Sequence, residues 1–314
     1  IVSGNDGIQA ENTLNILNGT FNITTGGGSK NASTTSSGSI NDLWQFGPNK
    51  NPGNQQTAQT DAESAKALKT SGNINIADGT FKIDSADDCI HSNANVVISG
   101  GTFNMASGDD GVHADTKLTI LAGNMVLTKS YEGLEGAQVE ISGGNLDITA
   151  DDDGINAAGG TNQTGIQGRP GQNSFNSDIS AYITVSGGYI LVNASGDGID
   201  SNGTFSLTGG IVLVSGPTNS GNGALDYESN ATVSGGILIA TGSSGMATGF
   251  TQADNQGAMF VNFSTQLGEK TIALTDENNK IVKATTDKDG IYSFLNIKDG
   301  SYLVVFDYNT NQYV

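Results

Sequence analysis

The sequence predicts an all-β protein, a parallel β-helix of about eight coils of about 22 residues, and three observations lead to this fold. A short acidic phrase recurs, and its last acidic residues are Asp88, Asp110, Glu132 and Asp153, in steps of 22, 22 and 21 residues. Apolar residues between these phrases alternate with polar ones, which is the two-residue period of a strand. The 314 residues include 45 Gly, only 4 Pro and 14% charged residues, which favours short strands and tight turns over long helices.

The first coil begins at once, with an acidic phrase at Gly4 to Ala10 followed by separated apolar positions that suggest three short strands per coil. A polar, Gly-rich insertion over 26–59 then interrupts the period. It contains the single tryptophan, Trp44, with Phe46 beside Pro48. These aromatic residues either form a sugar-stacking platform or hold the loop against its own scaffold.

The period resumes near Ala65, with Lys66 at the position that later coils fill with a carboxylate. Each following coil repeats the same four apolar positions, which we expect to form aliphatic stacks inside the helix. These positions are Ile74, Ile76, Phe81 and Ile83; Val96, Ile98, Phe103 and Met105; Leu118, Ile120, Met125 and Leu127; and Val139, Ile141, Leu146 and Ile148.

A second insertion over 158–180 contains Arg169, and the repeat continues after it until the phrase beginning at Gly242. From about Ala258 the texture changes. The sequence therefore predicts a β-helix domain over 1–262 and, over 263–314, strands that cap the helix and a small β-sandwich-like segment.

The net charge of −19 argues against a nucleic-acid or anionic-membrane partner, since both require clustered Lys and Arg. The single cysteine, Cys89, excludes an intramolecular disulfide and fits a slot for a small buried residue. No run of apolar residues reaches the length of a membrane span. Because Ile1 lies inside a repeat, we expect any export signal upstream of the chain.

The acidic phrases predict metal binding. Equivalent carboxylates on successive coils lie about 4.8 Å apart and repel by roughly 3 kcal/mol at an effective dielectric constant near 20. Calcium suits such a column, because one ion between two coils can contact an oxygen from each. The candidate ligands are Asp87, Asp88, Asp109, Asp110, Glu132, Glu135, Asp151, Asp152, Asp153, Asp197 and Asp200.

Two alternatives for this column remain. His91 and His113 occupy equivalent slots on adjacent coils, so they are candidate zinc ligands, although oxygen donors surround them. The acids can also cap turns by accepting hydrogen bonds from backbone N–H groups.

Five phrases, taken in order, resemble a family of clostridial and related cell-surface proteins that contain a carbohydrate-binding domain. They are DDCIH and DDGVH, KSYEGLEG, DDGINAAGG, SGPTNSGNGALDY and GSSGMA. The resemblance covers roughly Ser3 to Ala258. It implies a right-handed parallel β-helix with bound calcium and affinity for acidic plant-wall polysaccharide such as polygalacturonate or pectin, and for cellulose. Lys66 and Lys69 depart from the acidic pattern, which puts metal binding in the first coils in question.

The pattern D-G-x-Y-x-F near the C-terminus, followed by Tyr302, Val304 and Phe306, resembles the prealbumin-like, immunoglobulin-type modules of bacterial surface proteins. This second resemblance covers about Lys270 to Val314 and implies a spacer or stalk.

Three functions therefore stand as hypotheses, all for an extracellular protein at the cell surface. In the first, calcium joins coil carboxylates to a uronate, with Lys129, Tyr131, Arg169 and Trp44 adding sugar contacts. In the second, the protein is a calcium-dependent pectate lyase that works by β-elimination with Lys129 as its base. The third is a passive surface spacer. The fold alone does not choose among them, and the sequence leaves the oligomeric state open.

Overall fold

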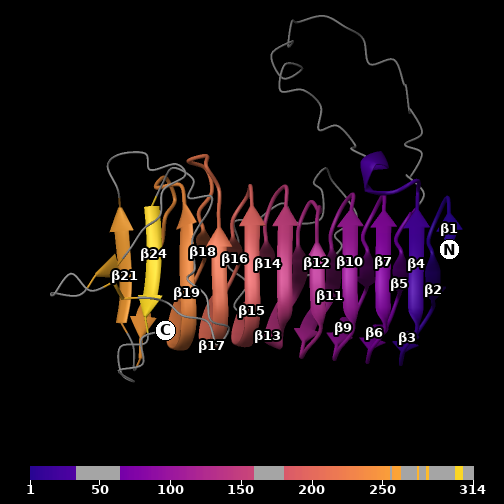
Figure 1. Cartoon of the computed structure of the whole chain (residues 1–314), viewed down its shortest axis with the longest axis horizontal. Coiled ribbons are helices and arrows are strands. Elements are labelled where there is room, and N and C mark those ends of the chain that lie inside the picture. Colours follow the sequence, from indigo (N-terminus) through magenta and orange to yellow (C-terminus); the bar gives the residue numbers. More distant parts are fainter. Residues whose placement is uncertain are drawn as a thin grey trace, which may run out of the picture.

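The computed structural model describes residues 1–32, 64–158, 180–254, 257–262, 274–275, 281–282 and 301–306. Within these residues the chain winds into a parallel β-solenoid, with the N-terminus at one end and the last coils at the other (Figure 1). This confirms the predicted all-β, parallel, coiled architecture. Each coil contributes strands to three faces, and each face is a stack of parallel strands joined by backbone hydrogen bonds.

The first face carries the acidic phrases. Its eight strands pair in succession and belong to β2 (Ile8–Ala10), β5 (Leu68–Thr70), β8 (Ile90–Ser92), β11 (Val112–Ile120), β13 (Leu134–Ala150), β14 (Ile155–Ala157), β16 (Ile199–Ser201) and β18 (Leu225–Tyr227).

The second face begins with β3 (Thr13–Ile16), β6 (Asn73–Ile76) and β9 (Asn95–Ile98) and continues through β11 and β13. The third face begins with β1 (Val2–Ser3), β4 (Thr20–Thr25), β7 (Thr80–Ser85), β10 (Thr102–Ser107) and β12 (Asn124–Leu127). From β13 onward a single long strand runs through both the second and the third face of each coil. The later strands of this kind are β15 (Tyr182–Ala194), β17 (Thr204–Ser215) and β19 (Asn230–Gly242), and β20 (Gln252–Ala253) adds to the second face.

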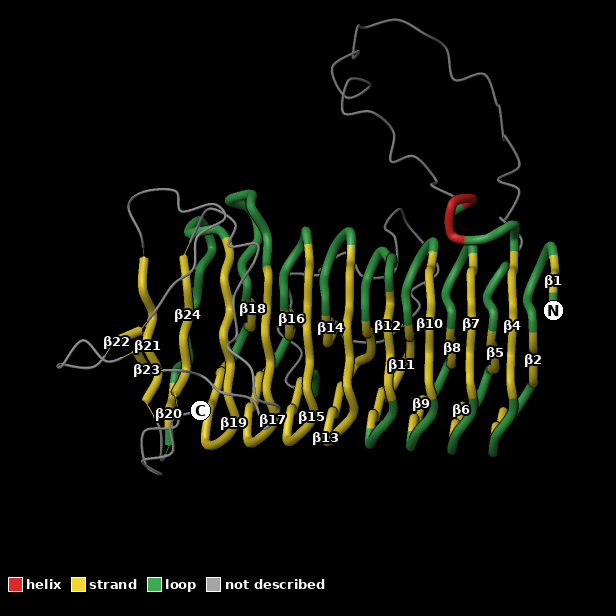
Figure 2. Tube along the Cα trace, in the orientation of Figure 1, coloured by secondary structure: helices red, strands yellow, loops and turns green. Residues whose placement is uncertain are grey.

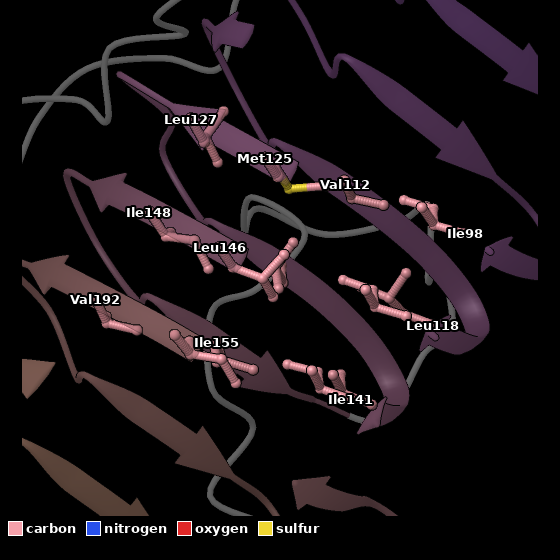
Figure 3. Packing of buried hydrophobic residues seen from close by; sticks show 14 of the residues in the cluster. Ile98, Val112, Leu118, Met125, Leu127, Ile141, Leu146, Ile148, Ile155 and Val192 are labelled. Atoms are coloured by element: carbon pink, nitrogen blue, oxygen red, sulfur yellow. The ribbon is translucent and has the colours of Figure 1, made fainter. Parts of the chain in front are cut away.

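The core lies inside the coils and is built from the predicted apolar stacks. Figure 3 shows neighbouring coils placing Leu127, Ile148 and Val192 side by side, and each is at most 3% exposed. The rings of Phe21, Phe81 and Phe103 stack at 4.8 and 4.6 Å between centroids. The repeat thus places identical side chains on top of one another, and each coil shares its core with the next.

The bend between the second and third faces explains one glycine in every coil. This position has a positive φ, between +77° and +144°, in Gly19, Gly79, Gly101, Gly123, Gly144, Gly188, Gly210 and Gly236. Side chains with a Cβ rarely adopt this backbone conformation, so the repeated Gly fixes where each coil turns.

The open end of the solenoid is extended by antiparallel strands. β24 (Ser301–Phe306) pairs with β19 on one side and with β21 (Gly257–Asn262) on the other (Figure 2). β22 (Leu274–Thr275) and β23 (Ile281–Val282) form a separate two-stranded sheet. Because β24 joins the main sheet, these pairings give no support to a separate β-sandwich over 263–314.

The two predicted insertions fall mostly outside the described residues. Of the first, the structure describes residues up to Ala32, including a short 3-10 helix at Ser29–Asn31, and of the second only its end residues. Trp44 and Arg169 lie outside the described residues. In the described parts of the chain, no helix has the length and apolar character needed to cross a membrane.

Candidate functional site

Two columns of polar side chains run along the first face. The acid ladder is the last position of each acidic phrase and contains Asp6, Lys66, Asp88, Asp110, Glu132, Asp153 and Asp197. The mixed ladder lies three residues later in each coil and contains Lys69, His91, His113, Glu135, Asn156, Asp200 and Asp226. From Asp88 to Asp200 every member is buried. A buried charge is costly unless it is paired, so each coil must supply or recruit a compensating group.

The acid ladder caps the turns of the solenoid. Asp88 Oδ1 accepts a hydrogen bond from the backbone N–H of Asp110 at 3.0 Å, and Asp153 Oδ1 accepts one from Asp197 at 2.6 Å. Asp6 and Asp110 receive N–H groups from the next coil in the same way. The turn-capping alternative therefore explains one oxygen of these carboxylates, while the second oxygen is available to a cation.

Near the N-terminal end that cation is a lysine. Lys66 Nζ lies 2.6 Å from both Asp87 Oδ1 and Asp88 Oδ2, and Lys69 Nζ lies 3.1 Å from Asp6 Oδ2. Burial raises the pKa of Asp88, but the Lys66 ammonium and the hydrogen bond with His91 outweigh burial and hold this pKa well below its usual range. Asp87, Asp88 and Asp109 also bring carboxylate oxygens within 4.8 Å of one another. Two of these three carboxylates already have an internal counter-charge.

In the middle coils the mixed ladder contains the two histidines. Their rings stack with centroids 4.7 Å apart, and His91 Nδ1 lies 2.7 Å from Asp88 Oδ2. His113 Nδ1 lies 3.2 Å from Asp110 Oδ2 and also contacts Glu135 Oε2, while its Nε2 lies 3.0 Å from Asp115 Oδ1. Asp110, His113 and Glu135 each place one ligand atom within 4.8 Å of the others. We call these three residues the histidine cluster.

Toward the C-terminal end the ladders lose their cations. Asp153, Asp197 and Asp200, which we call the aspartate cluster, have ligand oxygens within 4.8 Å of one another, and all three side chains are buried. Among the described residues, no Lys, Arg or His forms an ion pair with them. Asp200 Oδ2 and the nearby Asn156 Oδ1 have no hydrogen-bond partner in the described part of the chain.

The acidity of the aspartate cluster reflects this missing counter-charge. Burial, followed by the charges of Asp152 and Asp197, raises the pKa of Asp153 to about 8. Burial raises the pKa of Asp197 to about 7, and burial with the charge of Asp153 raises the pKa of Asp200 well above its usual value. Without a cation, these carboxyl groups therefore retain protons near neutral pH.

The donor set of the aspartate cluster fits a hard divalent cation. Asp197 Oδ1 accepts the backbone N–H of Gly223, so this carboxylate, like that of Asp153, is oriented by the main chain. Gly196 permits the close approach, because a Cβ there would lie 2.4 Å from an oxygen of Asp152 and of Asp153. Three carboxylates and an amide oxygen are donors that Ca²⁺ accepts in its flexible six-to-eight-oxygen coordination.

The structure places the other predicted site residues as follows. Asp151 is exposed and Asp152 half-buried beside the aspartate cluster, while Glu132 is fully buried between the two clusters in the acid ladder. Tyr131 is half-buried, and Lys129 Nζ donates a hydrogen bond to the carbonyl oxygen of Ser29 at 2.8 Å. Trp44 and Arg169 cannot be placed within the described residues.

Sequence reasoning missed two members of the mixed ladder. Asn156 and Asp226 align with Asp200 through the register of β14, β16 and β18, but neither was chosen as a ligand. The 21-residue step from Glu132 to Asp153, applied to Glu135, would have found Asn156. The step from Asp200 to Asp226 is longer, 26 residues, so only the matching pairs Ile199-Asp200 and Leu225-Asp226 could have shown that alignment. The phrase supplies two ligand columns, three residues apart, and only the first was recognised as a continuous column.

The chain matches a known protein family. No curated protein and no solved structure matches the chain. A family model described as "Carbohydrate-binding domain-containing protein" matches residues 1–111 and 109–305, and the second match extends through most of the predicted prealbumin-like segment. Because these matches cover nearly the whole chain, the protein belongs to this family of carbohydrate-binding domain-containing proteins.

Proposed function

We propose that this protein binds acidic plant-wall polysaccharide, with polygalacturonate as the principal ligand and cellulose as a further one, in a calcium-dependent and non-catalytic manner at the bacterial cell surface. The observation that carries the calcium requirement is the aspartate cluster. It holds three buried carboxylates with no internal cation among the described residues, and two of the nearby oxygens lack a partner. Family membership supports the polysaccharide ligand.

Calcium in this cluster would act first on the scaffold. Asp153, Asp197 and Asp200 come from successive coils, so one ion would join coils that otherwise repel each other. The half-buried Asp152 and Asp226 and the exposed Asp151 lie beside this buried charge. They are the carboxylates able to share further calcium ions with the uronates of a polysaccharide.

The contact made by Lys129 favours binding over lyase chemistry. A β-elimination base must present an uncharged nitrogen lone pair to the substrate proton. Lys129 Nζ instead donates to the Ser29 carbonyl oxygen, and Asp109 and Glu132 lie on the coils around it. In this setting Lys129 either holds the loop or donates to a uronate, and neither role uses Nζ as a base.

The test is retention of the full chain on immobilised polygalacturonate in calcium and in excess chelator. We expect retention in calcium, loss in chelator, and strong weakening in Asp200→Asn. Asp147→Asn is the matched control, because Asp147 is an exposed residue of β13 outside both ladders. Equal retention of the wild type in calcium and chelator would refute the calcium requirement, and no retention in either would refute this ligand.

The same samples separate a binder from a lyase. We expect no growth of the ultraviolet absorbance of unsaturated uronate products during prolonged incubation with polygalacturonate and calcium. Steady growth that Lys129→Ala abolishes would establish the lyase instead.

A further inference from the structure

The histidine cluster differs in chemistry from the aspartate cluster. Its ligand atoms are one imidazole nitrogen and two carboxylate oxygens, whereas the aspartate cluster presents carboxylates alone. Calcium selects oxygen donors, whereas a mixed set of imidazole and carboxylate is typical of zinc and related divalent ions. The two clusters therefore call for different ions.

The contacts around His113 Nδ1 leave one acceptor without a donor. Nδ1 lies 3.2 Å from Asp110 Oδ2 and also contacts Glu135 Oε2, yet this nitrogen can carry only one hydrogen. Glu135 Oε2 is buried and, apart from this contact with Nδ1, no hydrogen bond to it is found in the described chain. A cation that replaces the Nδ1 proton would contact all three ligand atoms.

A second buried oxygen points to the same need. Glu132 is fully buried; its Oε2 accepts a hydrogen bond from Asn156 Nδ2 at 2.8 Å, but its Oε1 has no partner among the described residues. Burial, then the charges of Glu135 and Asp110, raises the pKa of Glu132 well above its usual value. This carboxylate lies within electrostatic reach of the histidine cluster and is the candidate fourth ligand.

The far side of the His113 ring supplies the usual support for a metal-binding imidazole. Nε2 lies 3.0 Å from Asp115 Oδ1, so a neutral ring that donates its Nε2 hydrogen to Asp115 has a free lone pair on Nδ1. Metal-binding histidines characteristically donate their second ring N–H to a carboxylate in this way, which fixes the tautomer.

We propose that Asp110, His113 and Glu135 form a site for a divalent transition-metal ion of the Zn²⁺ class, separate from the calcium site and positioned by Asp115. His113 Nδ1 supplies the nitrogen ligand and the two carboxylates supply oxygens, with Glu132 as the candidate fourth donor. The neighbouring coil shows the contrast: His91 has the same place and faces Asp88, but Lys66 already neutralises that carboxylate.

The competing account is a protonated His113 that pairs with Asp110 and Glu135 without a metal. Burial lowers the pKa of His113, but Glu135 and the hydrogen bond with Asp110 raise it well above its usual value. Both accounts give a stable fold, so the experiment must detect nitrogen ligation itself. The chain has only two histidines, which makes the ring signals of His113 directly assignable in a protein without a histidine tag.

The experiment starts from metal-stripped full chain saturated with calcium, so that the aspartate cluster is filled. Zinc is then titrated by calorimetry, and nitrogen–proton spectra record both histidine rings. We expect one zinc per chain, not displaced by a large excess of calcium, with a shift of His113 Nδ1 to the metal-bound range. Cobalt in place of zinc should give absorption bands that His113→Gln removes.

Three variants make the result decisive. His113→Gln should lower zinc affinity by more than about 100-fold, and Asp115→Asn, which changes only the supporting carboxylate, by about 10- to 100-fold. His91→Gln, the matched control on the adjacent coil, should leave the affinity within about threefold, because His91 has no place in the cluster. If His113→Gln fails to fold, Asp115→Asn and the ring spectra still decide. Absence of zinc binding, zinc competed off by calcium, or equal affinities in the Asp115 and His91 variants would overturn the proposal.

Discussion

The two ends of the ladders differ in how a buried carboxylate obtains its counter-charge. At the N-terminal end, Asp88 is buried against the Lys66 ammonium at 2.6 Å, so the chain supplies its own cation. At the other end, Asp153, Asp197 and Asp200 are equally buried and have no ion-paired Lys, Arg or His among the described residues. The backbone repeat fixes the geometry in both places, and the local sequence decides whether the described chain supplies the cation itself.

The largest effect should come from removing the internal cation. Lys66→Met leaves Asp87 and Asp88 without their ammonium, and Asp88 is almost fully buried. Breaking a buried pair by deleting one partner costs about 3–5 kcal/mol, so we expect a loss of this order in the free energy of unfolding. Denaturant titration measures it, with the exposed Lys82→Met on β7 as control. If calcium restored the lost stability, the two ends would be interchangeable and the comparison would fail.

Calcium removal should act at the opposite end. An ion that binds only the folded state adds about 2.7 kcal/mol at a hundredfold excess over its dissociation constant, so chelator should lower the melting temperature by several degrees. In Asp200→Asn the difference between calcium and chelator should shrink, while in Lys66→Met it should persist. A melting curve unchanged by chelator would mean that turn capping alone accounts for the acidic phrase.

The pH dependence of the metal-free protein should have opposite signs at the two ends. The folded pKa of Asp153 is raised to about 8 and that of Asp197 to about 7, so stability from these groups is complete below their unfolded pKa of about 3.9 and is lost as the pH rises through 7 to 8. The pKa of Asp88 is instead lowered, so its stabilisation is present above about pH 3.9 and is lost on acidification.

Denaturant titrations of metal-free protein between about pH 5 and pH 8 test these signs. We expect stability to fall over this range in the wild type and to fall less in Asp153→Asn, while saturating calcium should remove most of the decline because the ion replaces the bound protons. An identical slope in the wild type and in Asp153→Asn would contradict the raised pKa.

The fold was predictable because a repeat of about 22 residues with alternating apolar positions indicates stacked β-coils. The columns through Ile98, Phe103 and Met105 recur at the coil period, and the structure buries all of them. The bend glycines recur at the same period, one in each coil. The C-terminal end was less predictable, because the pattern around Tyr302 and Val304 fits both a separate module and a strand added to the solenoid. In the structure, β24 pairs with the edge of the solenoid. Pairing between distant segments depends on which edge is left open, and local sequence does not encode that.

The site was predictable as a column but not as separate clusters. Spacing alone aligned Asp88, Asp110 and Asp153, yet it could not show that Lys66 reaches two carboxylates while Asp200 keeps an unpartnered oxygen. Side-chain reach and burial decide these contacts. The same limit explains Lys129, which the sequence placed beside the acids and the structure connects to Ser29 in the loop after the first coil.

Lys129 provides the check with the smallest expected effect. It is a basic residue next to the acidic phrase, yet within the described chain it forms no ion pair with a ladder carboxylate. Lys129→Met removes one hydrogen bond to a backbone carbonyl, which is worth about 1 kcal/mol, so we expect a small drop in the free energy of unfolding. The calcium-dependent rise in melting temperature should be unchanged, since the aspartate cluster is untouched. A large loss of stability, or a changed response to calcium, would place Lys129 in the charge balance of the ladder after all. The internal cations would then extend past Lys66, and the boundary between the two ends would lie farther along the solenoid.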